Sequence, residues 1–157
     1  MAPIDNIPLT GLARKFVFDQ IIDEDSAKQA QVHAKENNIS LINHLVSTNS
    51  AKAQDLAFSA GQEFGMPVLD LSAFLIDTLP EKLVDEKLVR KHQALPLYVR
   101  GNRLFIAISD PTNISATDEI KFHTGLSVDA VLVEDDKLRA AIDKYLESQD
   151  TTMGDLD

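Results

Sequence analysis

An apolar stretch from Leu95 to Pro111 limits most strongly what this chain can fold into. Its two ends, Leu95–Val99 and Leu104–Ile108, are rich in aromatic and β-branched residues, which favour strands. The segment between them, Arg100–Arg103, contains Gly and Asn, which tolerate the positive φ angles of a tight turn. The pattern predicts a β-hairpin, and other elements must cover a hairpin this apolar.

Helices are expected on both sides of this hairpin. One should begin near Pro80, since Pro suits the first helical turn, and end near His92. The expected elements after the hairpin are a helix from Asn113 or Ser115 to Thr124 with Ile114, Ile120 and Phe122 as its apolar residues, a strand over Leu126–Val133, and a last helix that buries Leu138, Ala141, Ile142 and Tyr145.

The first half of the chain predicts four short helices. The first runs from Thr10 to Gln20, and the expected caps of the others are Asp23 or Asp25, Ser40 and Ser50. These helices form two pairs that resemble an internal repeat, because Phe16-Val17 and Ala27 recur 29 residues later as Leu45-Val46 and Leu56. A plain four-helix cluster without a repeat is the alternative.

The predicted fold class is therefore α+β. A four-helix subdomain of two helix-pair repeats comes first, followed by a small α/β subdomain with about three strands and three helices. The expected boundaries are a flexible arm over 1–8, the helical repeat over 9–66, a connector over 67–78, the α/β subdomain over 79–147 and an acidic linker over 148–157.

Composition and missing motifs exclude several classes of function. The chain of 157 residues has a formal net charge of -10, which disfavours nucleic acid as a partner, and it has no Cys for disulfides or thiolate catalysis. Its four His residues lack metal-ligand spacing, and no phosphate-binding loop, dinucleotide fingerprint or nucleophile elbow occurs. We therefore predict a non-catalytic module with no catalytic residues, no metal and no cofactor of its own.

Three runs, Phe64–Leu71, Glu86–Asn113 and Ile120–Glu147, carry a family resemblance through their order and spacing. Together they resemble the N-terminal region of the secretion ATPases that drive type II secretion and type IV pilus assembly, most of all the pilus extension motors. The resemblance implies that hexameric ATPase domains, which would use ATP and Mg, follow a linker after Tyr145. It also implies a cytoplasmic location at the inner face of the bacterial inner membrane.

In some relatives each helix pair carries the motif RLGxxLVxxGxIxxxxLxxALxxQ and binds cyclic di-GMP. The resemblance places Arg-Leu-Gly of this motif on Gly11-Leu12-Ala13 and on Ser40-Leu41-Ile42. The inner Gly falls on Gln20 and Asn49, and the final Gln falls on Ala34 and Glu63. The apolar positions of the motif persist, but the positions that would contact the ligand do not.

A second behaviour of the family is regulation by the small adaptor protein PilZ, which bridges the motor to a cyclic di-GMP receptor. Such a protein surface needs exposed apolar anchors, and the first helix pair offers Leu12, Phe16, Phe18, Ile21 and Ile22. Phe18 lies off the main apolar face and is the expected central anchor. The alternatives are that these residues pack in the core, that the chain senses cyclic di-GMP directly, or that it docks on the inner-membrane pilus platform protein.

Overall fold

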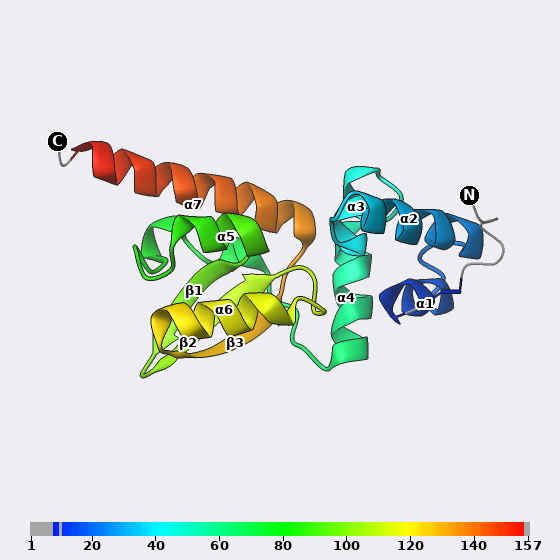
Figure 1. The fold of residues 1–157 in the computed structure, drawn as a ribbon, viewed down its shortest axis with the longest axis horizontal. Coiled ribbons are helices and arrows are strands. Elements are labelled where there is room, and N and C mark those ends of the chain that lie inside the picture. Colours follow the sequence, from blue (N-terminus) through cyan, green and yellow to red (C-terminus); the bar gives the residue numbers. More distant parts are fainter. Residues whose placement is uncertain (1–7, 10, 156–157) are drawn as a thin grey trace.

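A computed structural model describes residues 8, 9 and 11–155 of the chain, with side chains as far as residue 149. Within these residues it contains seven α-helices and a three-stranded sheet, which confirms the predicted α+β class. Helices α1 to α4 lie at one end of the molecule, and the sheet with α5, α6 and α7 forms the other end (Figure 1). The predicted flexible arm lies almost entirely outside the described residues.

The two helix pairs of the first half share one backbone geometry. They are α1 (Gly11–Phe18) with α2 (Glu24–Glu36), and α3 (Leu41–Ser47) with α4 (Ala53–Phe64). Gln20 and Asn49, at equivalent positions after α1 and α3, both have left-handed backbone, with φ of 62° and 56°. The next amide in each copy donates to the equivalent carbonyl, Ile21 to Phe16 and Ser50 to Leu45, both at 2.9 Å. This equivalence favours the repeat over a plain cluster of helices.

Side-chain caps begin two of these helices as predicted. Asp23 accepts a hydrogen bond from the Ser26 amide at the start of α2, and Ser40 accepts one from the Asn43 amide at the start of α3. The prediction that Ser50 caps α4 is wrong, because this helix begins after Lys52 without a side-chain cap. The Ser50 hydroxyl lies instead 2.8 Å from that of Thr48. The buried residues of α2 are Ala27, Ala30 and Ala34, whose small side chains let the neighbouring helices approach closely.

The sheet has the order β1-β2-β3, with β1 (Leu95–Arg100), β2 (Arg103–Ile108) and β3 (Ser127–Leu132). The hairpin β1–β2 is antiparallel and turns at Gly101, where φ is 64°, whereas β3 pairs in parallel with β2 after the crossover through α6. The central strand carries Leu104 and Ile106, both fully buried. This confirms that the apolar hairpin is covered on the face of these two residues, whereas Phe105 and Tyr98 on the other face are partly exposed.

Three helices flank the sheet: α5 (Glu86–His92), α6 (Ile114–Thr124) and α7 (Asp135–Asp155). The prediction of a helix from Pro80 is wrong, because Lys82 has a φ of 57°, incompatible with a right-handed helix, and Asp85 caps α5 instead. Asn113 caps α6 as predicted. The last helix is longer than expected and runs to Asp155, so most of the predicted linker is helical.

The connector between the two halves joins the sheet. The Leu69 amide donates to the Leu132 carbonyl at 2.8 Å, and the Leu132 amide donates to the Pro67 carbonyl at 2.9 Å. Two short 3-10 helices, η2 (Leu71–Ala73) and η3 (Ile76–Thr78), follow this bridge. Buried side chains form one hydrophobic cluster that extends from Leu12 in α1 to Leu146 in α7. The helical repeat is therefore packed onto the α/β half.

Candidate docking surface on the helical repeat

Three of the five predicted partner-binding residues are core residues. Leu12 and Ile22 are buried, and Phe16 has no exposed surface at all. Because each short helix of the repeat has one apolar face, that face is needed for packing against the other helices. The expectation that Leu12, Phe16 and Ile22 lie on the surface is therefore wrong, and Ile21 is only half-exposed and packs against the core.

Phe18 is the predicted residue that the structure leaves accessible. It is the last residue of α1, and 81% of its surface is exposed. The Lys15 ammonium lies 5.8 Å from the centroid of its ring, within the range of a cation–π contact. Large aromatic side chains are common among the residues that contribute most to protein interfaces. An exposed Phe on a helix is therefore a candidate for such a residue.

A polar cluster holds the end of α1 and the turn after it against α4. The Ser59 hydroxyl on α4 donates to the Asp19 carboxylate at 2.6 Å, and the Lys15 ammonium lies 3.1 Å from the same carboxylate. Lys15 also donates to the side-chain oxygen of Gln62 at 3.5 Å. The Ser59 hydrogen bond and then Lys15 lower the pKa of Asp19 below its ordinary value of 3.8, so the carboxylate is charged near neutral pH.

Sequence reasoning missed a second aromatic residue on α4. Phe58 precedes Ser59, and 54% of its surface is exposed. The sequence could have indicated its exposure, because Phe58 lies off the apolar face that Leu56, Ala57 and Ala60 form. Phe64, the last residue of α4, is also exposed.

The positions of the nucleotide-binding motif offer little to an anionic ligand. Ala13 and Ala34 are buried, Ile42 is in the core, and Glu63 is an exposed acid. The nearby guanidinium of Arg14 donates to the backbone carbonyl of Leu9 at 3.1 Å. Within the described residues no group of three His, Cys, Asp or Glu side chains could hold a metal ion.

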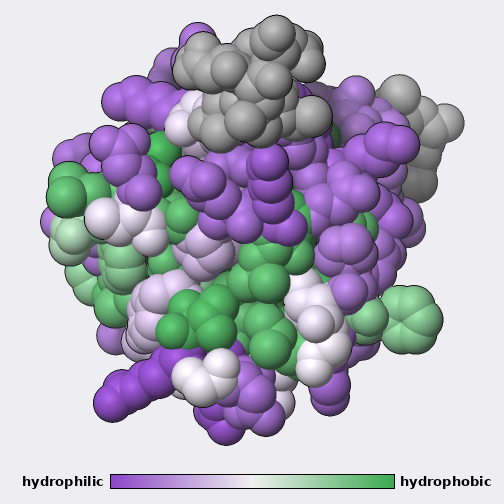
Figure 2. Space-filling model, turned by 90° about the vertical axis from the view of Figure 1, so that its left-hand side faces the viewer, coloured by the Kyte–Doolittle hydropathy of each residue, from purple (hydrophilic) through white to green (hydrophobic). Residues whose placement is uncertain are grey.

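A second apolar surface lies at the opposite end of the molecule. Phe122 is one of the three apolar residues expected on α6, and 93% of its surface is exposed. Ile114 on the same helix is also exposed, whereas Ile120 is buried. A cavity of about 630 Å³ beside Phe122 is lined by Leu88, Asp118, Glu119 and His123. Figure 2 shows hydrophobic side chains gathered in the middle of this end, among polar ones. No described helix is both long enough and apolar enough to span a bilayer.

Comparison with known proteins places the chain in a family. The sequence profile of the MshEN domain matches residues 64–152, and the chain belongs to this domain family. It is 43% identical over 153 residues to the type IV pilus assembly ATPase PilB of Pseudomonas aeruginosa, which covers 98% of the chain. PilB of Acinetobacter baylyi is 33% identical over 136 residues, which is 87% of the chain. The matches cover 27% and 24% of these relatives, so the chain spans about a quarter of their length.

Two solved structures share the fold. A structure of MshE with cdg has a TM-score of 0.64 and 26% sequence identity, and the match covers 87% of this chain and 99% of that one. The N-terminal domain of XpsE has a TM-score of 0.70 at 18% identity, covering 88% and 99% of the two chains. The chain thus has the fold of the N-terminal domains of this class of ATPase, as the sequence runs predicted.

Proposed function

We propose that this chain is a regulatory, partner-docking domain of a type IV pilus assembly ATPase, and that it binds the adaptor PilZ through α1 and α4. Binding of PilZ would link cyclic di-GMP signalling to pilus extension. The remainder of such a protein would supply the hexamer, the ATP and Mg sites and the ATPase activity. The complete machine would lie at the inner face of the bacterial inner membrane.

The exposure of Phe18 is the observation that carries this proposal. Burying a Phe side chain stabilises by roughly 1.5–3 kcal/mol relative to leaving it exposed. Phe18 at the end of α1 could therefore contribute this free energy to the binding of a partner. Phe58 on the packed neighbour α4 adds a second exposed ring, and Lys15, Asp19 and Gln62 add polar groups. Aromatic rings with a polar rim match the composition of hot spots in protein interfaces.

Co-elution with PilZ in size-exclusion chromatography at micromolar concentration tests the proposal. The wild-type chain should form a complex, and Phe18→Asp should lose it, because a carboxylate cannot replace the aromatic ring in a dry interface. Phe122→Asp is the matched control, since it makes the same change at a ring that is at least as exposed and lies on α6. The proposal fails if the wild-type chain does not bind PilZ, and the choice of anchor fails if Phe18→Asp binds normally.

Direct binding of cyclic di-GMP is a second candidate, and one observation favours it. The related MshE structure contains cdg, and Gln20 and Asn49 keep the left-handed backbone that the inner Gly of the motif would adopt. The loss of the Arg and Gln positions weighs against it, since these supply the charge and hydrogen bonds for a nucleotide. Titration calorimetry with cyclic di-GMP separates the candidates, because sub-micromolar affinity would favour the direct sensor over the adaptor.

The surface around Phe122 favours a third candidate, docking on the inner-membrane pilus platform protein. This surface lies on the α/β half, away from α1, so both partners could bind the chain at once (Figure 1). Here the roles of the two variants are reversed: Phe122→Asp should weaken binding to the platform protein, and Phe18→Asp should leave it intact. Equal binding of both variants would contradict this candidate.

A further inference from the structure

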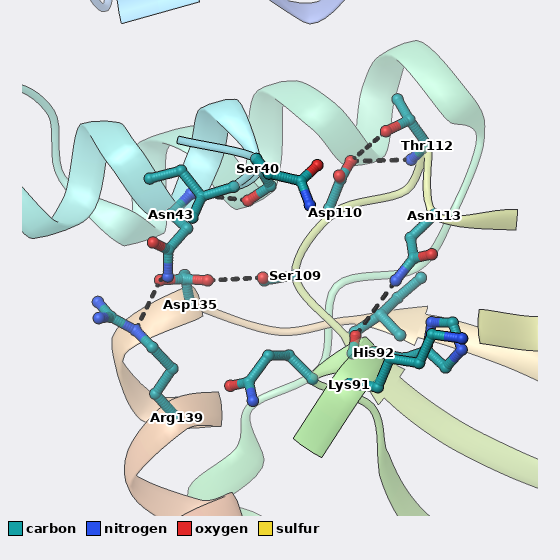
Figure 3. A pocket seen from close by; sticks show the side chains of 14 residues that line it. Ser40, Asn43, Lys91, His92, Ser109, Asp110, Thr112, Asn113, Asp135 and Arg139 are labelled. Atoms are coloured by element: carbon teal, nitrogen blue, oxygen red, sulfur yellow. Dashed lines mark hydrogen bonds and ion pairs between the residues drawn. The ribbon is translucent and has the colours of Figure 1, made fainter. Parts of the chain in front are cut away.

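A buried carboxylate joins the helical repeat to the α/β half. Asp135, the first residue of α7, is only 4% exposed and lies on the wall of a cavity of about 620 Å³ at the junction. Figure 3 shows its carboxylate between three side chains that come from different elements. One carboxylate oxygen accepts a 2.7 Å hydrogen bond from the Ser109 hydroxyl, which follows β2.

The other oxygen of Asp135 faces α3 and α7. The Asn43 side-chain amide of α3 donates to it at 3.4 Å, and Arg139 Nε, one turn further along α7, lies 3.0 Å away as an ion pair. The N-terminal end of α7 also favours a negative charge. Burying a carboxylate is costly unless it is paired and hydrogen-bonded. Arg139 and Ser109 meet that condition within the α/β half, and Asn43 adds the contact that reaches the helical repeat.

The bridge between the connector and β3 is a second attachment of the two halves. It consists of the backbone hydrogen bonds between Pro67–Leu69 and Leu132, and Gly61 of α4 packs closely on it. This short bridge holds the two halves at one point, and the shared hydrophobic cluster packs them together around it. Apolar contacts across the junction are non-directional, and the hydrogen bond between Asn43 and Asp135 adds a directional side-chain contact to them. Asn43, in α3, gives Asp135 an attachment to the repeat that is separate from the bridge.

We propose that Asp135 is a latch that sets the orientation of the helical repeat relative to α7. With the latch closed, the bridge and the carboxylate together fix the repeat at two points. Without the carboxylate, both halves stay folded and the repeat moves about the connector. The latch is a property of the free chain and needs no partner, so its test is separate from the test of PilZ binding.

Distance measurements between spin labels test the latch in the free chain. The chain has no Cys, so pairs of introduced Cys residues label it cleanly. The pair Lys35→Cys with Lys144→Cys spans the junction from α2 to α7, and Lys35→Cys with Gln54→Cys stays within the repeat; all three positions are exposed. Asp135→Ala should broaden the distance distribution across the junction and leave the distribution within the repeat unchanged.

Asp136→Ala is the matched control, because it removes an exposed acid from the same first turn of α7. Asn43→Leu is the milder variant. It removes only the hydrogen bond from α3 and leaves the contacts of Ser109 and Arg139 with the carboxylate. It should also broaden the distribution across the junction, which keeps the test decisive if Asp135→Ala does not fold.

Amide hydrogen exchange supplies an independent readout. Loss of hydrogen bonds to a charged group should raise exchange at junction amides of α3 and the start of α7 by about tenfold or more. Exchange in β2 should change little. An unchanged distance distribution in both variants would overturn the latch, and so would equal broadening of both label pairs or an equal effect of Asp136→Ala.

Discussion

The Ser59 hydroxyl on α4 donates a 2.6 Å hydrogen bond to the Asp19 carboxylate, in the turn that follows α1. These two residues join the first helix of one repeat to the second helix of the other. Ser59 is almost fully buried, so its hydroxyl needs this acceptor. The contact ties the turn after α1 to α4, and it has a pH dependence with a definite sign.

Stability should fall with acidification through Asp19. Its folded pKa is below 3.8, so its contribution is complete above 3.8 and is lost as the pH falls through the folded pKa. Urea unfolding of wild type and Asp19→Asn should therefore differ most near neutral pH, and the difference should shrink at pH values below 3.8. The exposed acid Asp25 on α2 gives the control variant Asp25→Asn. A difference that is independent of pH would contradict the role of the Asp19 charge.

Phe16 and Phe18, two residues apart, should lose very different amounts of stability when they are truncated. Phe16→Ala opens a cavity in the core and should lower the free energy of unfolding by roughly 3–5 kcal/mol. Phe18→Ala removes a solvent-exposed ring with one cation–π contact and should cost under about 1 kcal/mol. Denaturant unfolding monitored by circular dichroism measures both changes. Similar losses for the two variants would place Phe18 in the core and remove it as a docking anchor.

Glycine should be favourable at the left-handed position after α1. Gln20 has a φ of 62°, which strains a residue with a Cβ, so Gln20→Gly should raise the free energy of unfolding by about 0.5–1 kcal/mol. Gln54→Gly provides the opposite case, because Gln54 is an exposed residue in the first turn of α4, where Gly should cost less than about 1 kcal/mol. Thermal unfolding measures the sign of the stability change in both variants. A loss of stability in Gln20→Gly would mean that the side chain of Gln20 compensates the strain.

Gly61→Ala should destabilise the chain although Ala is the better helix former. An added Cβ would lie 2.9 Å from the Val68 side chain and 3.0 Å from the Met66 carbonyl oxygen, so α4 and the connector would have to separate. Overpacking of this kind costs roughly 1–3 kcal/mol, which outweighs the gain in helix propensity of about 1 kcal/mol. Gln62→Ala, at the exposed neighbour, should be close to neutral. A stabilised Gly61→Ala would show that the connector yields easily.

Local patterns predicted most of the secondary structure. The apolar hairpin, the third strand and the two helix pairs follow from residue spacing, and Asp23, Ser40 and Asn113 cap helices as expected. The errors occur where tertiary packing, and not the local sequence pattern, determines the backbone conformation. Pro80 looked like the start of a helix, yet Lys82 adopts left-handed backbone, and the segment before α5 packs by Leu79 and Val84 instead.

The docking residues show the same division. An apolar residue on a short helix can face the core or the solvent, and spacing along one helix does not say which neighbours cover it. Leu12, Phe16 and Ile22 are buried in the core, whereas most of the surface of Phe18 and Phe122 is exposed. The Phe18 prediction rested on its position off the helix face, which is information that the sequence contains.

The sequence by itself determined the α+β class, the repeat and its missing ligand residues, because helix and strand periods and the identity of each motif position are local properties. Only the tertiary structure decided that Leu12, Phe16 and Ile22 are buried and that Asp135 joins Asn43 to Ser109. Those residues are far apart in the chain, and their contact depends on how the helical repeat packs on the α/β half, which no local pattern encodes.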